Sequence, residues 1–82
     1  MSTMSFGGAI EALKQGKKVA RAGWNGKRMW LVLVVASHWE TTRGLEELEG
    51  LPWIGIKTAD NKFVPWLASQ TDILAEDYSL VD

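Results

Sequence analysis

Two short stretches of the chain combine a tryptophan with polar side chains that could bind a ligand. The first is Arg21-Ala22-Gly23-Trp24-Asn25-Gly26, and the second is Pro65-Trp66-Leu67-Ala68-Ser69-Gln70-Thr71-Asp72. An indole can stack on a flat heterocycle, a guanidinium can pair with a phosphate, and hydroxyl, amide or carboxylate groups can bind sugar and base edges. These chemical types together suit a small nucleotide. The candidate ligand-binding residues are Arg21, Trp24, Asn25, Thr58, Trp66, Ser69, Gln70 and Asp72.

The first stretch also has a structural interpretation. Gly23 and Gly26 can adopt positive φ angles, so this segment is either a loop that presents the Trp24 indole outward or a turn with Trp24 as a lid on the core. Arg21, at the end of a predicted strand, lies within reach of the same space in both cases. The residues alone leave the choice open.

The second stretch is equally ambiguous. Pro65 lacks the N–H that a central strand needs, so it marks an edge, a bulge or the end of a strand. Ser69 or Thr71 can cap a short helical turn over Asp72–Ala75. In the structural interpretation this is a capped turn between two strands, with Trp66 in the core. In the functional one, the helix start and the indole bind a ligand.

The sequence offers little for catalysis. Ser69, His38 and Asp72 could form a triad on paper, but nothing orients His38, which lies in the least patterned part of the chain. Glu76 and Asp77 are adjacent, so on a strand they would point to opposite sides. One histidine and no cysteine do not complete a metal set. We expect a protein without catalytic activity, metal or cofactor.

Length and composition indicate one small domain, residues 1–82. Without cysteine there are no disulfides, so extra stability must come from packing or oligomerisation. Five tryptophans are more than so small a core can hide. We expect some of them to line a pocket or an interface.

The charge pattern disfavours a DNA- or RNA-binding protein, because the formal net charge is −1. A local cationic patch is still expected, because positive residues gather in the first third of the chain. They are Lys14, Lys17, Lys18, Arg21, Lys27 and Arg28. The longest apolar run, Trp30–Ala36, is far shorter than the roughly 20 residues of a membrane span. We therefore expect a soluble, cytoplasmic protein without a membrane partner.

Hydrophobic periodicity predicts a helix over Phe6–Gln15 that ends at a left-handed Gly16. It also predicts strands over residues 17–21, 29–36, 53–58, 62–64 and 77–81, with a hairpin turn at Ala59-Asp60-Asn61. Residues 37–50 are polar and show no clear pattern. The predicted fold class is α+β, with the N-terminal helix packed on a small, mainly antiparallel β-sheet.

The strand predicted over residues 29–36 is apolar on both faces. The helix can cover one face. In a chain this short, a second subunit is the expected cover for the other.

Three sequence blocks carry a resemblance: Arg21-x-Gly23-Trp24-Asn25-Gly26, Lys57-Thr58-Ala59-Asp60, and Pro65-Trp66-x-x-Ser69-Gln70-x-Asp72. With the Phe6–Lys27 segment, they resemble the second Thoeris anti-defense family of phage proteins. The resemblance runs from Phe6 to Val81 and is weakest over residues 37–50.

The resemblance implies a non-enzymatic sponge that sequesters nucleotide immune signals such as glycocyclic ADP-ribose, with some relatives also taking cyclic dinucleotides. It also implies a homotetramer with ligand pockets at subunit boundaries. Without it, a small protein–protein interaction module with a tryptophan-rich interface would be the first hypothesis, and this stays the alternative.

Overall fold

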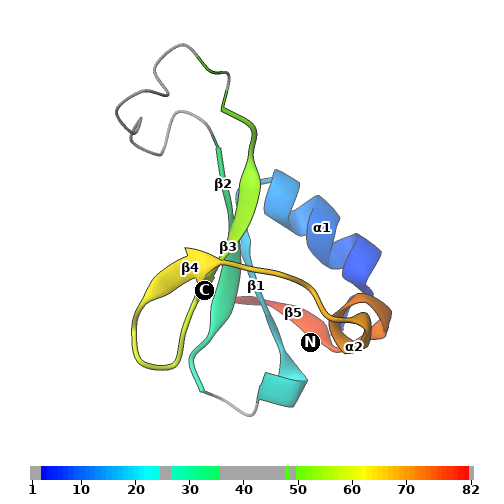
Figure 1. Ribbon diagram of the computed structural model, residues 1–82. Coiled ribbons are helices and arrows are strands. Elements are labelled where there is room, and N and C mark those ends of the chain that lie inside the picture. Colours follow the sequence, from blue (N-terminus) through cyan, green and yellow to red (C-terminus); the bar gives the residue numbers. More distant parts are fainter. Residues whose placement is uncertain (1–2, 25–26, 36–47, 49, 82) are drawn as a thin grey trace.

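The computed structural model describes residues 3–24, 27–35, 48 and 50–81. Its elements in chain order are α1 (Phe6–Lys14), β1 (Lys18–Arg21), the 3-10 helix η1 (Ala22–Trp24), β2 (Trp30–Val34), β3 (Trp53–Lys57), β4 (Phe63–Pro65), α2 (Gln70–Leu74) and β5 (Tyr78–Val81) (Figure 1). Most of the segment predicted to be polar and unpatterned lies outside the described residues.

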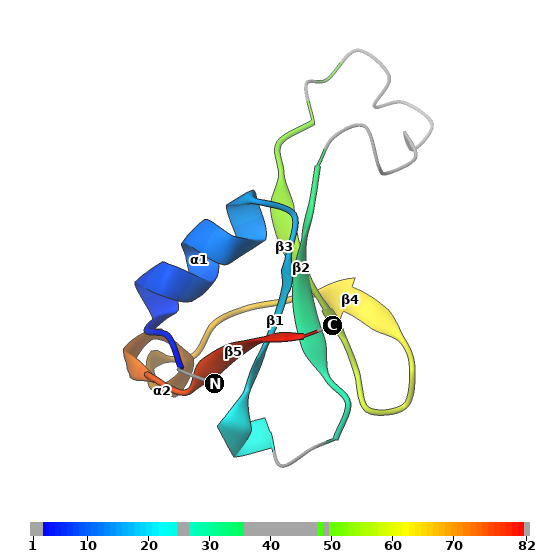
Figure 2. The same ribbon diagram turned by 180° about the vertical axis from the view of Figure 1, so that it is seen from behind.

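The strands form one five-stranded sheet in the order β4-β3-β2-β1-β5, with every neighbouring pair antiparallel. Strand β5, from the end of the chain, lies beside β1, and its register places Tyr78 opposite Arg21. Figure 2 shows this edge of the sheet from behind, with β5 crossing next to β1. The predicted α+β class, with an N-terminal helix and an antiparallel sheet, is confirmed.

Helix α1 begins where a capping residue allows it. The Ser5 hydroxyl accepts a hydrogen bond from the Gly8 N–H at 3.2 Å, which satisfies one of the free donors of the first turn. The helix ends at Lys14, one residue before the predicted end, and Gln15 is its C-cap. Gly16 has a φ of 85°, which confirms the predicted left-handed position.

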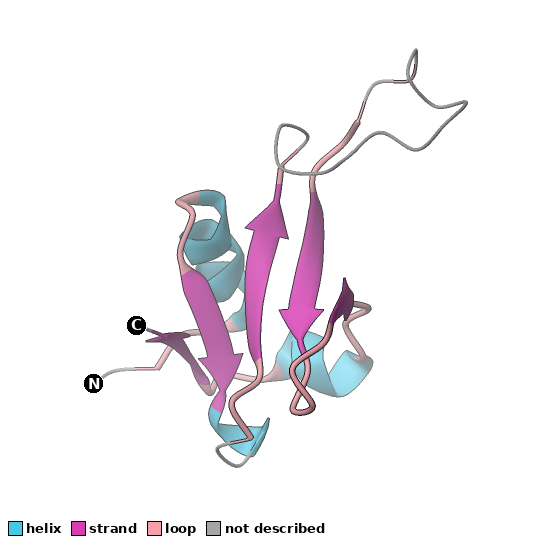
Figure 3. Cartoon of the chain, turned by 90° about the vertical axis from the view of Figure 1, so that its left-hand side faces the viewer, coloured by secondary structure: helices cyan, strands magenta, loops and turns pink. Residues whose placement is uncertain are grey.

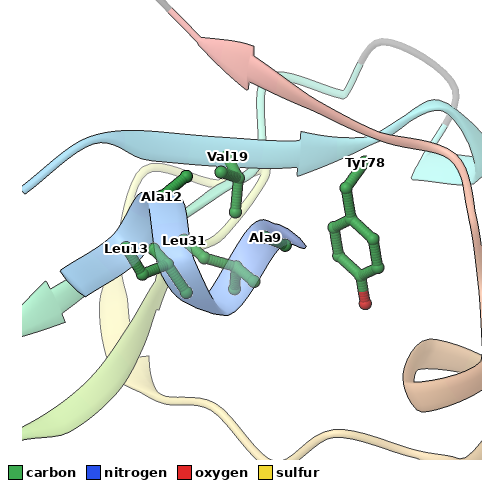
Figure 4. Close-up of a cluster of buried hydrophobic side chains, with 6 residues drawn as sticks. All are labelled: Ala9, Ala12, Leu13, Val19, Leu31 and Tyr78. Carbon is green, nitrogen blue, oxygen red and sulfur yellow. The ribbon is translucent and has the colours of Figure 1, made fainter. Parts of the chain in front are cut away.

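The core lies between α1 and one face of the sheet. Figure 4 shows its six buried side chains: Ala9, Ala12, Leu13, Val19, Leu31 and Tyr78. The two alanines let the helix backbone approach the strands closely, while the larger side chains fill the space between them. The helix supplies half of this cluster, and β1, β2 and β5 supply the rest.

The opposite face of the sheet has no helix over it in the described part of the chain (Figure 3). Because side chains alternate along a strand, Trp30 and Val32 of β2 and Trp53 of β3 point to this open face. Phe63 of β4 is 45% exposed, and its ring lies over Gly55, where any Cβ would collide with it. The predicted cover by a second subunit stays a prediction.

In the C-terminal third, the helix cap, the hairpin turn and the place of Pro65 match the predictions, while the start of the helix differs. Helix α2 starts at Gln70, two residues earlier than the predicted turn, while Ser69 is its cap as expected. Asn61 has a φ of 67°, which fits the predicted hairpin turn. Pro65 ends the edge strand β4, also as expected.

The described helices α1 and α2 are nine and five residues long, and neither has the length and hydrophobicity to cross a membrane.

Candidate functional site

Arg21 joins two carboxylates that come from different elements. It is the last residue of β1; its Nη1 donates to Asp72 Oδ1 of α2 at 2.8 Å, and its Nε donates to Asp77 Oδ1 at 2.9 Å. The Arg21 and Asp72 side chains are each only 14% exposed, so this contact is largely shielded from water. Charge-assisted bonds of this kind are among the stronger hydrogen bonds in proteins. Arg21 therefore ties the end of β1 to α2 and to the residue before β5.

The ionisation of these groups follows from their contacts. The Arg21 hydrogen bond, helped by the Gly23 N–H, holds the pKa of Asp77 below its usual value against the effect of burial. Burial raises the pKa of Asp72, but hydrogen bonds from Ser69 and Arg21 outweigh it and the net pKa is lowered. Burial, with the nearby Asp72 charge, raises the pKa of Tyr78 to about 12. At neutral pH the cluster is one guanidinium between two carboxylates.

Asp72 has a second role as the partner of Ser69, the N-cap residue of α2. The Ser69 N–H and hydroxyl donate to Asp72 Oδ2 at 2.9 and 2.8 Å, and the Asp72 N–H donates to Ser69 Oγ at 3.1 Å. This is a capping box, which holds the first turn of a short helix. The Ser69 hydroxyl is therefore engaged in the cap of α2, and His38 lies outside the described residues. The capped-turn interpretation of this stretch is confirmed for Ser69.

Asp77 also holds the turn that carries Trp24. Its Oδ2 accepts from the Gly23 N–H at 2.8 Å, and its carbonyl accepts from the Ala22 N–H at 3.0 Å. The expectation of positive φ at Gly23 was wrong, because Gly16 alone among the described glycines has it. A Cβ at Gly23 would lie 3.3 Å from both Arg21 Nη2 and Asp77 Oδ2. A side chain at this position would press on the ion pair, and glycine avoids that tight contact.

Trp24 and Trp66 are in contact, edge to face. Their ring centroids are 6.5 Å apart at an interplanar angle of 77°, a favourable geometry for aromatic pairs. Trp66 also packs against Phe6 of α1, at 6.4 Å, and Phe6 against Tyr78, at 6.0 Å. Both indoles are half-buried against the core cluster. Trp24 is thus a lid on one edge of the core, and it keeps part of its surface exposed.

An open hollow of about 450 Å³ lies beside Trp24, a volume within the usual range for small-molecule sites. Its described lining residues are Ala20, Arg21, Trp24, Lys27, Arg28, Met29, Trp30, Lys57 and Val81. This lining includes four cations and two indoles, and none of the described lining residues is acidic. The hollow can accept an anionic ligand with a flat ring.

The remaining predicted residues lie in different surroundings. Gln70 is exposed in the first turn of α2. Thr58 uses its hydroxyl inside the β3–β4 turn, where it contacts Asp60 and accepts from the Lys62 N–H at 3.0 Å. Asn25 lies outside the described residues. The structure therefore brings Arg21, Trp24, Trp66, Ser69 and Asp72 into one connected group, and engages Thr58 elsewhere.

Sequence reasoning missed two features of this region. Asp77 was expected inside a strand, whereas β5 begins at Tyr78 and leaves Asp77 free to turn toward Arg21. Lys57 and Met29 are not among the predicted site residues, although both line the hollow. Only the pairing of Arg21 with Tyr78 across the sheet would have pointed to Asp77. The described residues contain no group of three or more histidine, cysteine, aspartate or glutamate side chains placed to hold a metal ion.

Comparison with known proteins gives one consistent result. Residues 4–81 match the Thoeris anti-defense 2-like domain (Tad2-like). The chain is also 50% identical, over an alignment of 86 residues, to "Thoeris anti-defense 2" of Bacillus phage SP01; the alignment covers 95% of this chain and 94% of that protein. A match over almost the whole chain, with half of the aligned residues identical, shows that this protein belongs to the Thoeris anti-defense 2-like family, which is named for its anti-defense role.

Proposed function

We propose that this protein counters bacterial anti-phage defence by binding a cyclic nucleotide immune signal, such as glycocyclic ADP-ribose, and holding it chemically unchanged. Membership of the Thoeris anti-defense 2-like family supports the anti-defense role. The observation that carries the binding proposal is the hollow beside Trp24, with four cations and two indoles in its described lining. An ADP-ribose derivative offers two phosphates and an adenine ring, which match these two types of group.

The phosphates are assigned to the cations of the hollow. Lys57 Nζ donates to the Arg28 carbonyl at 2.9 Å, which fixes the lysine at the rim. Lys27 and Arg28 are exposed on the segment leading into β2. Arg21 already bonds to two carboxylates, so we assign it a smaller share of direct phosphate contact than its neighbours.

The base is assigned to an indole. Trp24 lines the hollow and is supported from behind by Trp66, so stacking on Trp24 requires no rearrangement of the pair. Trp30 is a second stacking surface in the same hollow, although Lys18 Nζ already lies 4.4 Å from its ring centroid. Cyclic dinucleotides combine phosphates and flat bases in the same way, so they are a second ligand class for the proposal.

We further propose that a second copy of the chain covers the open face of the sheet, as part of a homotetramer. Trp53 and Phe63 form an aromatic pair on that face, with ring centroids 6.0 Å apart. A half-buried tryptophan beside an exposed phenylalanine favours an interface. Sedimentation should give a species several times the 9.1 kDa chain mass at micromolar concentration; a 9.1 kDa species alone would contradict this proposal.

The same aromatic pair favours the alternative function, a protein–protein interaction module without a nucleotide ligand. The two functions differ in one measurable consequence. A ligand that binds only the folded protein must raise its unfolding temperature, so a thermal-shift panel of cyclic nucleotides separates them.

The test of sequestration is recovery of the ligand. The protein is incubated with excess glycocyclic ADP-ribose and separated from free nucleotide; the protein is then heat-denatured, and chromatography identifies the nucleotide in both the released and the free fractions. We expect the original compound in an amount that matches the binding sites. A linear or hydrolysed product beyond one equivalent would show turnover and refute the proposal.

A further inference from the structure

We propose that Asp77 is a positioning residue for the Trp24 indole. Asp77 belongs to none of the sequence blocks that carry the family resemblance. The positional part of this inference stands on the geometry alone, and only its consequence for ligand affinity rests on the proposed function.

The two carboxylate oxygens of Asp77 serve two different partners. Oδ1 accepts from Arg21 Nε at 2.9 Å, and Oδ2 accepts from the Gly23 N–H at 2.8 Å. The main-chain carbonyl of Asp77 accepts from the Ala22 N–H at 3.0 Å. One residue therefore holds the guanidinium and two successive N–H groups of the turn that follows β1.

That turn carries Trp24 directly. Helix η1 is only three residues long, Ala22–Trp24, and the Gly23 N–H belongs to the residue before the indole. A 3-10 turn this short has little stability of its own, so its geometry depends on contacts from outside. The Asp77 carboxylate supplies such a contact on the backbone, and Trp66 supplies one on the indole.

Arg21 fixes Asp77 in turn. The guanidinium bridges Asp77 to Asp72, and Asp72 is held by the Ser69 capping box and through its carbonyl, which accepts from Tyr78 Oη at 2.7 Å. The path from the capping box to the Gly23 N–H, one residue before Trp24, thus runs through consecutive hydrogen bonds. The neighbouring Glu76 is exposed and offers a matched carboxylate for comparison.

The first arm of the test measures the indole pair without ligand. Two indoles in edge contact give a coupled near-ultraviolet circular dichroism signal, and the difference between wild type and Trp24→Phe defines the contribution of Trp24. We expect Asp77→Asn to lose most of that contribution while far-ultraviolet dichroism stays unchanged. Glu76→Gln should keep it.

The second arm is a double-mutant cycle on affinity for glycocyclic ADP-ribose. If Asp77 acts through Trp24, Asp77→Asn should weaken binding roughly tenfold in the wild type and less than about twofold in a Trp24→Ala background, which has no ring to position. A residue that only stabilises the fold would have similar effects in both backgrounds. Asp77→Glu keeps the negative charge but has a side chain that is one methylene longer. It serves as a second variant if Asp77→Asn does not fold.

The outcomes separate the two proposals. An unchanged Trp24 signal in a folded Asp77→Asn or Asp77→Glu protein would overturn the positioning role, and so would equal affinity losses in both backgrounds. If wild type binds no nucleotide, the proposed function fails, and the spectroscopic arm alone then decides the role of Asp77.

Discussion

The two faces of the sheet present different kinds of side chain, although the same strands form both. On the helix side, Val19 and Leu31 are fully buried against small residues of α1. On the open side, β2 and β3 present Trp30, Trp53 and Lys57, large or charged groups that have no helix over them in the described chain. The first composition suits dry packing within one chain, and the second suits contact with another molecule.

A matched pair of substitutions tests this difference most strongly. Val19→Ala removes two buried carbons from the helix side and should lower the free energy of unfolding by about 2–3 kcal/mol, because the transfer and cavity costs add. Val32→Ala makes the same change on the half-buried open face, where we expect about 1 kcal/mol or less. Urea unfolding at low protein concentration measures both. Equal losses would show that the two faces are equally packed within one chain.

The next effect concerns binding rather than stability. Trp24→Ala should weaken binding of glycocyclic ADP-ribose by about 1–3 kcal/mol, the usual cost of removing a base-stacking ring. Calorimetric titration measures the change, and a cooperative thermal transition confirms that the variant is folded. Loss of the fold in this variant would instead assign Trp24 to the core alone.

The smallest effect is a dependence of stability on acid. The pKa values of Asp72 and Asp77 are lowered by folding from an ordinary 3.8, so their stabilisation is complete above that pH and is lost as the pH falls through the lower folded values. The free energy of unfolding should therefore decrease below about pH 4. The Asp77 side chain is 30% exposed, so we expect its share to be about 1 kcal/mol or less.

Two substitutions separate the contribution of the Asp77 carboxylate to acid-dependent stability from the general effect of acid on the protein. Asp77→Asn should flatten the decrease in stability below pH 4, whereas Glu76→Gln, at an exposed neighbouring position, should keep the wild-type profile. Identical profiles for Asp77→Asn and wild type would show that the Arg21–Asp77 contact contributes no measurable stability.

Local patterns in the sequence predicted most of the fold. The apolar spacing of α1, the left-handed Gly16, the Ser69 cap and the turn at Asn61 are each properties of a few consecutive residues, and all of them are present. Such features depend on nearby backbone geometry and hydrogen bonds, which residue types specify directly.

The candidate site was harder to predict because it depends on register. Arg21 and Asp77 are 56 residues apart, and they meet only because β5 pairs with β1 in one particular alignment. Gly23 shows the same limit: its type suggested a positive φ, whereas the structure uses it to admit an ion pair. The hollow likewise collects residues from β1, η1, β2, β3 and β5, which no single stretch of sequence brings together.

The hollow beside Trp24 is the proposed binding site of the signal, and two lysines of the β3–β4 hairpin allow a direct test of it. Lys57 lines the hollow, whereas Lys62 has a 75% exposed side chain and is not part of the described lining. Each is changed to glutamine, and calorimetry measures the affinity for glycocyclic ADP-ribose at two salt concentrations.

We predict that wild type and Lys62→Gln bind with a dissociation constant below about 1 μM, as a sponge requires. Lys57→Gln should bind more weakly and with a smaller dependence on salt, because one cation near the phosphates is lost. Equal affinity and equal salt dependence for Lys57→Gln and Lys62→Gln, or no binding by the wild type, would contradict the account.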